Sequence, residues 1–346
     1  MNSIRALWSA GGLVLTIALF VPSGAAAQEP APAAVEPEAA VAAAPRVAER
    51  GPLPTRAPAK IYLRTFNASG GTVDVNDRVR AVARIKPFVP DEVMQIRFVH
   101  GDDIVKRRNL RIKKMGDRDA GKVKLISENI LEPGRYRAIA VKKGTSEQEP
   151  DSDRSRRFHP VYPDLDPGDH NGYVSLFNSL LKKRSYYLGG GRSYSDGTSR
   201  AVMAFRKVNN MSRSFNASPQ IFKILADGRG GFNLQRPGTG HHVEVDISRQ
   251  VMVLADNGRP QHIFHVSTGA PSTPSDRGSF RFYRKDPGFN SIGMYYSVYY
   301  NRGEATHGYK SVPPYPASHG CIRNPIPNSV FIYNWIHLGD PIYVYG

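Results

Sequence analysis

The chain has 346 residues, with 47 Lys and Arg against 30 Asp and Glu, so its formal net charge is +17. This length allows two or three domains, and the single cysteine excludes a fold held together by disulfides within the chain. A chain this basic usually meets a polyanion, such as nucleic acid, anionic lipid or an acidic polymer.

Residues 1–27 have the pattern of a secretory signal peptide. Arg5 precedes an apolar stretch at 6–21, and small residues follow at 24–27. We expect cleavage after them, although the stretch could instead be retained as an anchor, which needs about 20 apolar residues. Export predicts a secreted or cell-envelope protein and argues against nucleic acid as a partner. The cell wall and its attached polymers then become the expected polyanions.

Two segments of different composition follow the signal. Residues 28–60 are rich in Ala, Pro and Glu and predict a disordered linker, because they lack the apolar bulk of a core. In residues 61–160 apolar side chains alternate with polar ones, as at Val79, Ala81 and Ile85. Short strands with polar turns predict an antiparallel β-sandwich, and the segment resembles the immunoglobulin-like modules of extracellular bacterial proteins. Such a module could be a spacer or a binding domain.

Residues 164–236 change to helical spacing and predict a small three-helix bundle. Apolar residues recur at helical intervals at Tyr173, Leu176, Phe177 and Leu180, and again at Ala201, Val202, Phe205 and Val208. We expect Asp196 to cap the second helix, and Ser218 with Pro219 to begin the third.

The second of these helices opens with the run Ser-Asp-Gly-Thr-Ser-Arg-Ala-Val-Met-Ala-Phe-Arg at 195–206. This run resembles the three-helix peptidoglycan-binding domain, which implies affinity for glycan. Arg206 stands where that family usually has Gln. We interpret Phe205 as a core residue rather than a ligand contact.

Residues 239–346 return to strand patterns and predict a compact β-rich domain. Val243, Val245 and Ile247 alternate, and the turn Asp256-Asn257-Gly258 predicts a hairpin. A short helix is expected at 329–336, before a last strand that ends at Tyr345. The predicted fold class is therefore multidomain and mainly β, with a sandwich, a helical bundle and this C-terminal domain.

The lone cysteine, Cys321, follows a loop that begins after His307. In an exported protein it could form an intermolecular disulfide, lie inert in the core or act as a nucleophile. A nucleophilic thiol needs a base, and His307 could reach Cys321 if the loop folds back. Gly320 leaves space for backbone N–H groups to face a developing oxyanion. Spacing alone leaves the nucleophilic and the inert interpretation equally open.

The sequence gives little support to a metal or cofactor site. One cysteine and dispersed histidines do not form a structural zinc pattern. We interpret His241 and His242 as a surface pair or the start of a strand rather than as a ligand pair. No metal and no cofactor are expected.

The run Ser318-His319-Gly320-Cys321-Ile322-Arg323, preceded by His307-Gly308, resembles the signature of YkuD-like L,D-transpeptidases. The segments at 267–280 and 330–344 resemble that family's flanking strands and terminal helix. The resemblance implies that Cys321 is the acylated nucleophile and His307 its general base, oriented by the Gly308 carbonyl. It also implies the roles of the surrounding residues: Ser318, His319 and Gly320 shape the pocket, the N–H groups of Gly320 and Cys321 form the oxyanion hole, and Arg323 holds the substrate.

The resemblance further implies the reaction and the partners. Cys321 would attack a tetrapeptide stem of peptidoglycan, expel D-alanine and form a thioester, which an amine of a second stem resolves into a 3→3 cross-link. Peptidoglycan stem peptides and glycan are the expected partners, and carbapenem-type β-lactams the expected inhibitors. Two alternatives stay open, an L,D-carboxypeptidase that transfers the acyl group to water, and a non-catalytic wall-binding protein.

Overall fold

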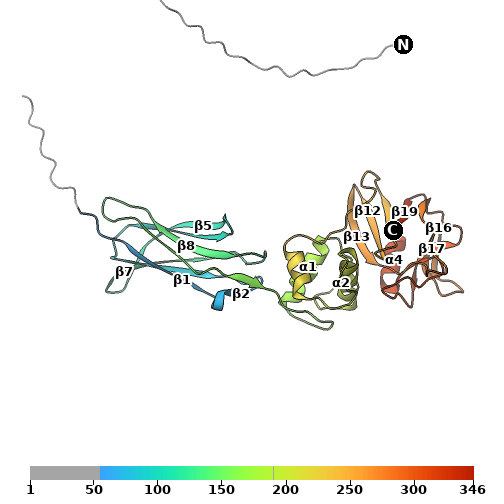
Figure 1. The fold of residues 1–346 in the computed structure, drawn as a ribbon, viewed down its shortest axis with the longest axis horizontal. Helices are drawn as coiled ribbons and strands as arrows, with labels where there is room; N and C mark the ends of the chain where they lie inside the picture. The colour runs from blue at the N-terminus through green and yellow to red at the C-terminus, as the bar shows by residue number, and fades with distance from the viewer. Residues whose placement is uncertain (1–54, 190) are drawn as a thin grey trace, which may run out of the picture. The chain divides into compact units, whose positions relative to one another are not determined.

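The computed structural model describes residues 55–189 and 191–346 (Figure 1). The predicted signal peptide, 1–27, and most of the predicted linker, 28–60, lie outside the described residues. Within the predicted linker, Ala57 forms a β-bridge with Gln148 and Lys60 pairs with Lys86, so these two residues take part in strand pairing. Across the described ranges, we find no helix with the length and apolar character needed to cross a bilayer.

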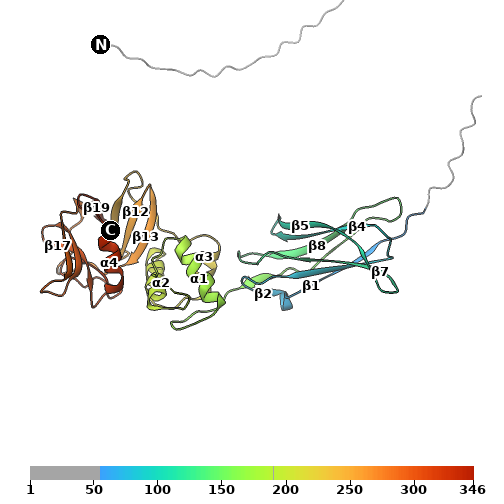
Figure 2. The ribbon, with the colours of Figure 1, turned by 180° about the vertical axis from the view of Figure 1, so that it is seen from behind.

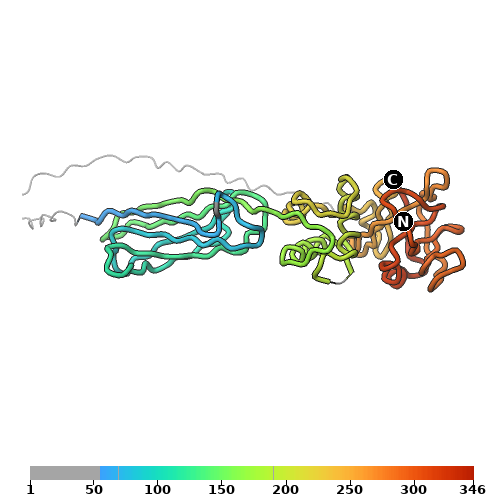
Figure 3. The backbone as a smooth tube through the Cα atoms, turned by 90° about the horizontal axis from the view of Figure 1, so that it is seen from below, coloured from blue at the N-terminus to red at the C-terminus, as the bar shows by residue number. Residues whose placement is uncertain are grey.

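The N-terminal part consists of two four-stranded antiparallel sheets, with strand orders β1-β3-β7-β6 and β5-β4-β8-β9. Their strands run lengthwise through this part (Figure 3). The elements are β1 (Lys60–Phe66), η1 (Ser69–Gly71), β2 (Thr72–Asp74), β3 (Arg80–Lys86), β4 (Val93–His100), β5 (Asp103–Arg111), β6 (Lys113–Met115), β7 (Arg118–Ile126), β8 (Tyr136–Lys142), β9 (Asp151–Arg154) and β10 (His159–Val161).

One hydrophobic core joins these two sheets. Ala81, Ala83 and Ile85 of β3 share it with Ile96 and Phe98 of β4, and all five are buried. The period-two alternation places these side chains on the inner faces, while the charged neighbours of β3 stay exposed. The immunoglobulin-like assignment of this part stays a prediction.

Three helices follow, α1 (Gly172–Lys183), α2 (Asp196–Val208) and α3 (Pro219–Ala226), and they lie together in Figure 2. Phe177, Phe205 and Phe222, one from each helix, are fully buried in a common core. Arg206 donates to the carbonyls of Ser212 (3.0 Å) and Asn216 (2.7 Å), so it holds the chain that leaves α2. Membership of the peptidoglycan-binding family stays a prediction.

The N-cap predicted for α3 is confirmed, whereas the N-cap predicted for α2 is wrong. Ser218 is the N-cap of α3 and Pro219 its first residue, as expected. The prediction of Asp196 as the cap of α2 is wrong, because Ser195 has the extended backbone of an N-cap and Asp196 is already helical. In the first turn the Asp196 carboxylate instead complements the helix dipole.

The C-terminal part has a five-stranded sheet, β13-β12-β11-β19-β14, and a four-stranded sheet, β15-β16-β17-β18. Apolar side chains of both sheets and of α4 form one core. The elements are β11 (His242–Asp246), β12 (Val251–Asp256), β13 (Arg259–His265), β14 (Gly278–Arg281), β15 (Arg284–Phe289), β16 (Tyr295–Asn301), β17 (Glu304–Tyr309), β18 (Ile322–Pro325), α4 (Ile326–Trp335) and β19 (Pro341–Tyr345).

The hairpin turn of this part was predicted correctly, whereas the start of its helix lies earlier than predicted. Asn257 and Gly258 both have positive φ, 50° and 72°, and form the predicted two-residue hairpin turn between β12 and β13. Helix α4 begins at Ile326, three residues before the predicted 329, because the first turn tolerates Pro327, whose missing N–H has no helical partner there.

A buried lysine connects α2 to the C-terminal sheet. Lys207 is 2% exposed, and its Nζ donates to the carbonyls of Gln250 (3.0 Å) and Val266 (2.8 Å) and to Nδ1 of His265 (2.6 Å). Nε2–H of His265 donates in turn to the Val312 carbonyl (3.0 Å). Burial lowers the pKa of Lys207, and nearby Arg213 adds to this effect. The helical part is therefore fastened to the loop that precedes Cys321.

We expect Lys207→Met to lower the free energy of unfolding by about 3 kcal/mol, because three buried acceptors lose their donor. Urea unfolding of the purified protein measures this change. Lys182→Met, at the exposed end of α1, is the matched control and should stay within about 0.5 kcal/mol of wild type. An equally small effect of Lys207→Met would show that the network adds no net stability.

Candidate active site

The parallel pairing of β17 with β18 brings the predicted catalytic residues together. His307 pairs with Arg323 and Thr306 with Ile322. Because paired residues of neighbouring strands point to the same side, His307 and Arg323 lie on the same face. Cys321 directly precedes β18 and packs against Ala305, which lies two residues before His307 on β17. Thr306 and Ile322 are fully buried and lie on the opposite face.

The loop between the two strands returns through backbone contacts with residues 267–275. The N–H groups of Ala317 and Ser318 both donate to the Thr268 carbonyl (2.9 Å each). The Ser318 hydroxyl donates to the Cys321 carbonyl, and the Ser275 hydroxyl donates to the Gly320 carbonyl. Ser318 therefore holds the loop that carries Cys321.

Two glycines of the signature are required by space and by backbone conformation. A Cβ at Gly308 would lie 2.1 Å from the Ser329 hydroxyl oxygen of α4, so only glycine lets α4 pack against β17. Gly320 has φ +111°, which side-chain-bearing residues rarely adopt, and a Cβ there would lie 2.9 Å from Oε1 of Glu304. Glycine at these two positions therefore allows the close packing of α4 on β17 and the tight turn before Cys321.

His307 is buried on β17 and is neutral at physiological pH. Its Nδ1 lies 2.9 Å from the Gly308 carbonyl oxygen. Because a carbonyl can only accept, Nδ1 carries the proton and Nε2 keeps its lone pair. Burial lowers the pKa of His307 to about 4, opposed by the Gly308 carbonyl and helped by Arg323. Nε2 is therefore a proton acceptor.

Cys321 is partly buried and packs against Met294, Tyr299 and Ala305. Burial raises the pKa of the Cys321 thiol, the Ala305 N–H lowers it, and the Glu304 carboxylate raises it further. The resting site therefore pairs a neutral thiol with a neutral imidazole. Such a thiol becomes a nucleophile when a base takes its proton during the attack.

Two predicted pocket residues lie next to Cys321 in the loop. The Gly320 N–H, expected in the oxyanion hole, donates to the Ser318 hydroxyl oxygen (3.2 Å). His319 is exposed beside it. The pocket role of His319 and the oxyanion role of the Gly320 N–H stay predictions.

Tyr309 lies in the site although the sequence motif did not assign it there. The Arg323 guanidinium lies 4.2 Å from the centre of the Tyr309 ring, and the His307 ring meets the same ring edge-on at 5.7 Å. Arg323 is thus held by a cation–π contact. The alternation from His307 to Tyr309 was the signal that could have found it. Met294 and Tyr299, which come from the neighbouring hairpin, had no such signal.

Comparison with known proteins gives a family to this part of the chain. Residues 240–344 match the YkuD model, the L,D-transpeptidase catalytic domain. An L,D-transpeptidase structure from Xylanimonas cellulosilytica is 27% identical, with a TM-score of 0.50, over 54% of this chain and 98% of that chain.

Two further solved structures are more distant. One from Stackebrandtia nassauensis is 20% identical over 54% of this chain and 97% of that chain, with a TM-score of 0.34. L,D-transpeptidase 1 of Mycobacterium tuberculosis is 27% identical over 31% and 62%, with a TM-score of 0.26. No curated protein sequence gives a significant match. From the matched residues and the site that they build, residues 240–344 form an L,D-transpeptidase catalytic domain of the YkuD family.

Proposed function

We propose that the protein is an exported peptidoglycan L,D-transpeptidase that forms 3→3 cross-links through a thioester on Cys321. The observation that carries the proposal is the register of β17 and β18, which puts His307 and Arg323 on one face, with Cys321 directly before β18. The YkuD match supports the reaction class. The acceptor and the thioester are steps that we infer from the chemistry of these residues.

In the first step His307 Nε2 takes the Cys321 thiol proton while Sγ attacks the carbonyl that joins the diamino acid to D-alanine. The carbonyl oxygen becomes an oxyanion near the Cys321 N–H, which is the donor that we assign to it. The C–N bond then breaks, His307 returns the proton to the leaving amine, and D-alanine departs. A thioester remains on Cys321.

In the second step the side-chain amine of another stem attacks the thioester. His307 accepts a proton from this amine and delivers it to the departing thiolate, which restores the neutral thiol. Arg323, stacked on Tyr309, is placed to hold a carboxylate of the peptide. No metal or organic cofactor is required by either step.

The other parts of the chain fit an enzyme that works on the wall. The net charge of +17 suits a polyanionic surface, and the 1–27 pattern supports export to the cell envelope. We assign wall binding to residues 164–236, on the strength of the resemblance at 195–206. The sandwich then acts as a spacer or as a second binding module.

The product test uses purified protein and a defined tetrapeptide muropeptide. We expect cross-linked dimers with release of D-alanine, and no reaction by Cys321→Ser. Lys182→Ala serves as a control that stays active, since its side chain is exposed at the end of α1. Tripeptides without dimers would assign an L,D-carboxypeptidase instead. Folded wild type that binds insoluble wall but yields neither product would identify a non-catalytic binding protein.

A carbapenem tests the nucleophile directly. Opening of its lactam ring by Sγ should add the full mass of the drug to wild type and nothing to Cys321→Ala. Intact-mass measurement reads both. An equal adduct on the two proteins would place the acylated group elsewhere.

The pH dependence of carbapenem acylation follows from the pKa of His307. His307 gains a proton as the pH falls through about 4 and then cannot accept the thiol proton. We expect the acylation rate to change less than about twofold between pH 5 and 8 and to fall with a midpoint near pH 4. Circular dichroism at each pH controls for unfolding. A midpoint near 6.5 would show that His307 titrates as a solvent-exposed histidine.

A further inference from the structure

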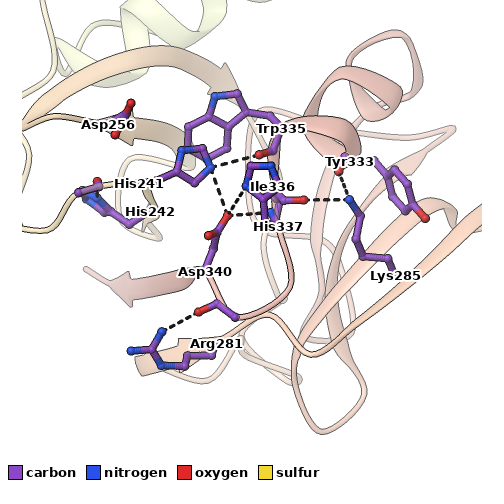
Figure 4. A network of polar contacts seen from close by, with 12 residues as sticks. His241, His242, Asp256, Arg281, Lys285, Tyr333, Trp335, Ile336, His337 and Asp340 are labelled. Carbon is purple, nitrogen blue, oxygen red and sulfur yellow. Dashed lines mark hydrogen bonds and ion pairs between the residues drawn. The ribbon is translucent and has the colours of Figure 1, made fainter.

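A second group of chemically active side chains lies away from Cys321, where the first and last strands of the catalytic domain begin. His241 directly precedes β11, while His337 and Asp340 lie in the connection from α4 to β19. His241 Nε2 is 3.2 Å from Oδ2 of Asp340, and His337 Nδ1 is 3.4 Å from the same oxygen (Figure 4). The three potential ligand atoms all lie within 4.8 Å of one another.

We propose that His241, His337 and Asp340 bind a zinc-type divalent cation. Two imidazoles and one carboxylate form a ligand set typical of Zn²⁺. With Zn–N and Zn–O lengths of about 2.1 Å, neighbouring ligand atoms of a tetrahedral site lie about 3.4 Å apart. Both measured distances to Asp340 agree with this spacing.

Two of the three ligands are held in place by their surroundings. The His241 ring is stacked on the Trp335 ring, with centroids 3.7 Å apart and an angle of 22° between the planes. Asp340 Oδ2 accepts the His337 backbone N–H at 2.7 Å. Such outer contacts orient metal ligands before the ion arrives.

The third ligand, His337, can adjust its position to bind the ion. The His337 side chain is 70% exposed, so its ring can rotate toward the other two ligands. The Trp335 carbonyl oxygen, 3.1 Å from His241 Nε2, or a water molecule would supply the fourth ligand.

The neighbouring positively charged side chains, Lys285 and Arg281, bind backbone carbonyls rather than Asp340. Lys285 Nζ donates to the carbonyls of Tyr333 (2.6 Å) and Ile336 (2.8 Å), and Arg281 donates to the carbonyl of Gly339 (2.6 Å). Asp340 therefore keeps its carboxylate for His241 and His337 (Figure 4). These positive charges oppose a second cation, so they limit the affinity without blocking the ligands.

The ion would tie together two strands that are neighbours in the sheet. β11 and β19 pair in parallel, with Val243 opposite Ile342. His241 stands before the first of these strands and Asp340 before the second, so one ion joins the N-terminal ends of the two strands. The predicted effect is stabilisation of the domain, independent of the Cys321 chemistry.

Metal binding is tested on the full-length protein without a histidine tag and with Cys321→Ser, because a thiol also binds zinc. We expect one equivalent of Zn²⁺ by native mass spectrometry and a visible d–d absorption with Co²⁺. At a zinc concentration 100 times Kd, we expect the Tm to rise by about 5 °C. His337→Ala should keep the metal-free Tm and lose the bound ion, the absorption and the Tm rise.

The matched control is His319→Ala in the same background, since His319 is also an exposed histidine. This variant should bind Zn²⁺ as the parent does. No bound ion in the parent would overturn the proposal, and so would binding that survives His337→Ala. Binding lost only with His319→Ala would assign the ion to the active site instead.

Discussion

The parallel pairing of β17 and β18 is the constraint on which the site depends. Two parallel neighbours cannot be joined by a tight turn, so the chain must travel back before it can run in the same direction again. Near the end of the return loop, the Ser318 hydroxyl donates a hydrogen bond to the Cys321 carbonyl. His307 is thus positioned by strand register, and Cys321 lies at the end of the return loop, directly before β18.

This return loop is held from outside the catalytic sheet as well. His265, itself bonded to Lys207 of α2, donates to the Val312 carbonyl, and Arg213 donates to the Pro314 carbonyl. A helical segment that resembles a wall-binding module is therefore also a structural support of the catalytic loop. Lys207, His265 and Arg213 thus connect the helical part to the loop that precedes Cys321.

The sequence predicted features that are local and periodic. Alternation identified β3, helical spacing identified α1 and α2, and Ser218 with Pro219 identified the start of α3. Contacts between distant segments could not be predicted, because nothing in the sequence around Lys207 or His241 indicates which residues they contact. The acceptor of the Gly320 N–H could not be predicted for the same reason, since the fold of the loop determines it.

The raised pKa of Cys321 also bears on how long the enzyme stays active. Oxidation to sulfenic acid proceeds through the thiolate, so a thiol kept neutral by burial and by Glu304 is a poor target for peroxide. With no second cysteine in the chain, neither a disulfide partner nor a resolving thiol is at hand. A thiol that stays neutral between turnovers is therefore protected from oxidation, which would matter most if the protein is exported, as we propose, beyond the reach of cytosolic reducing systems.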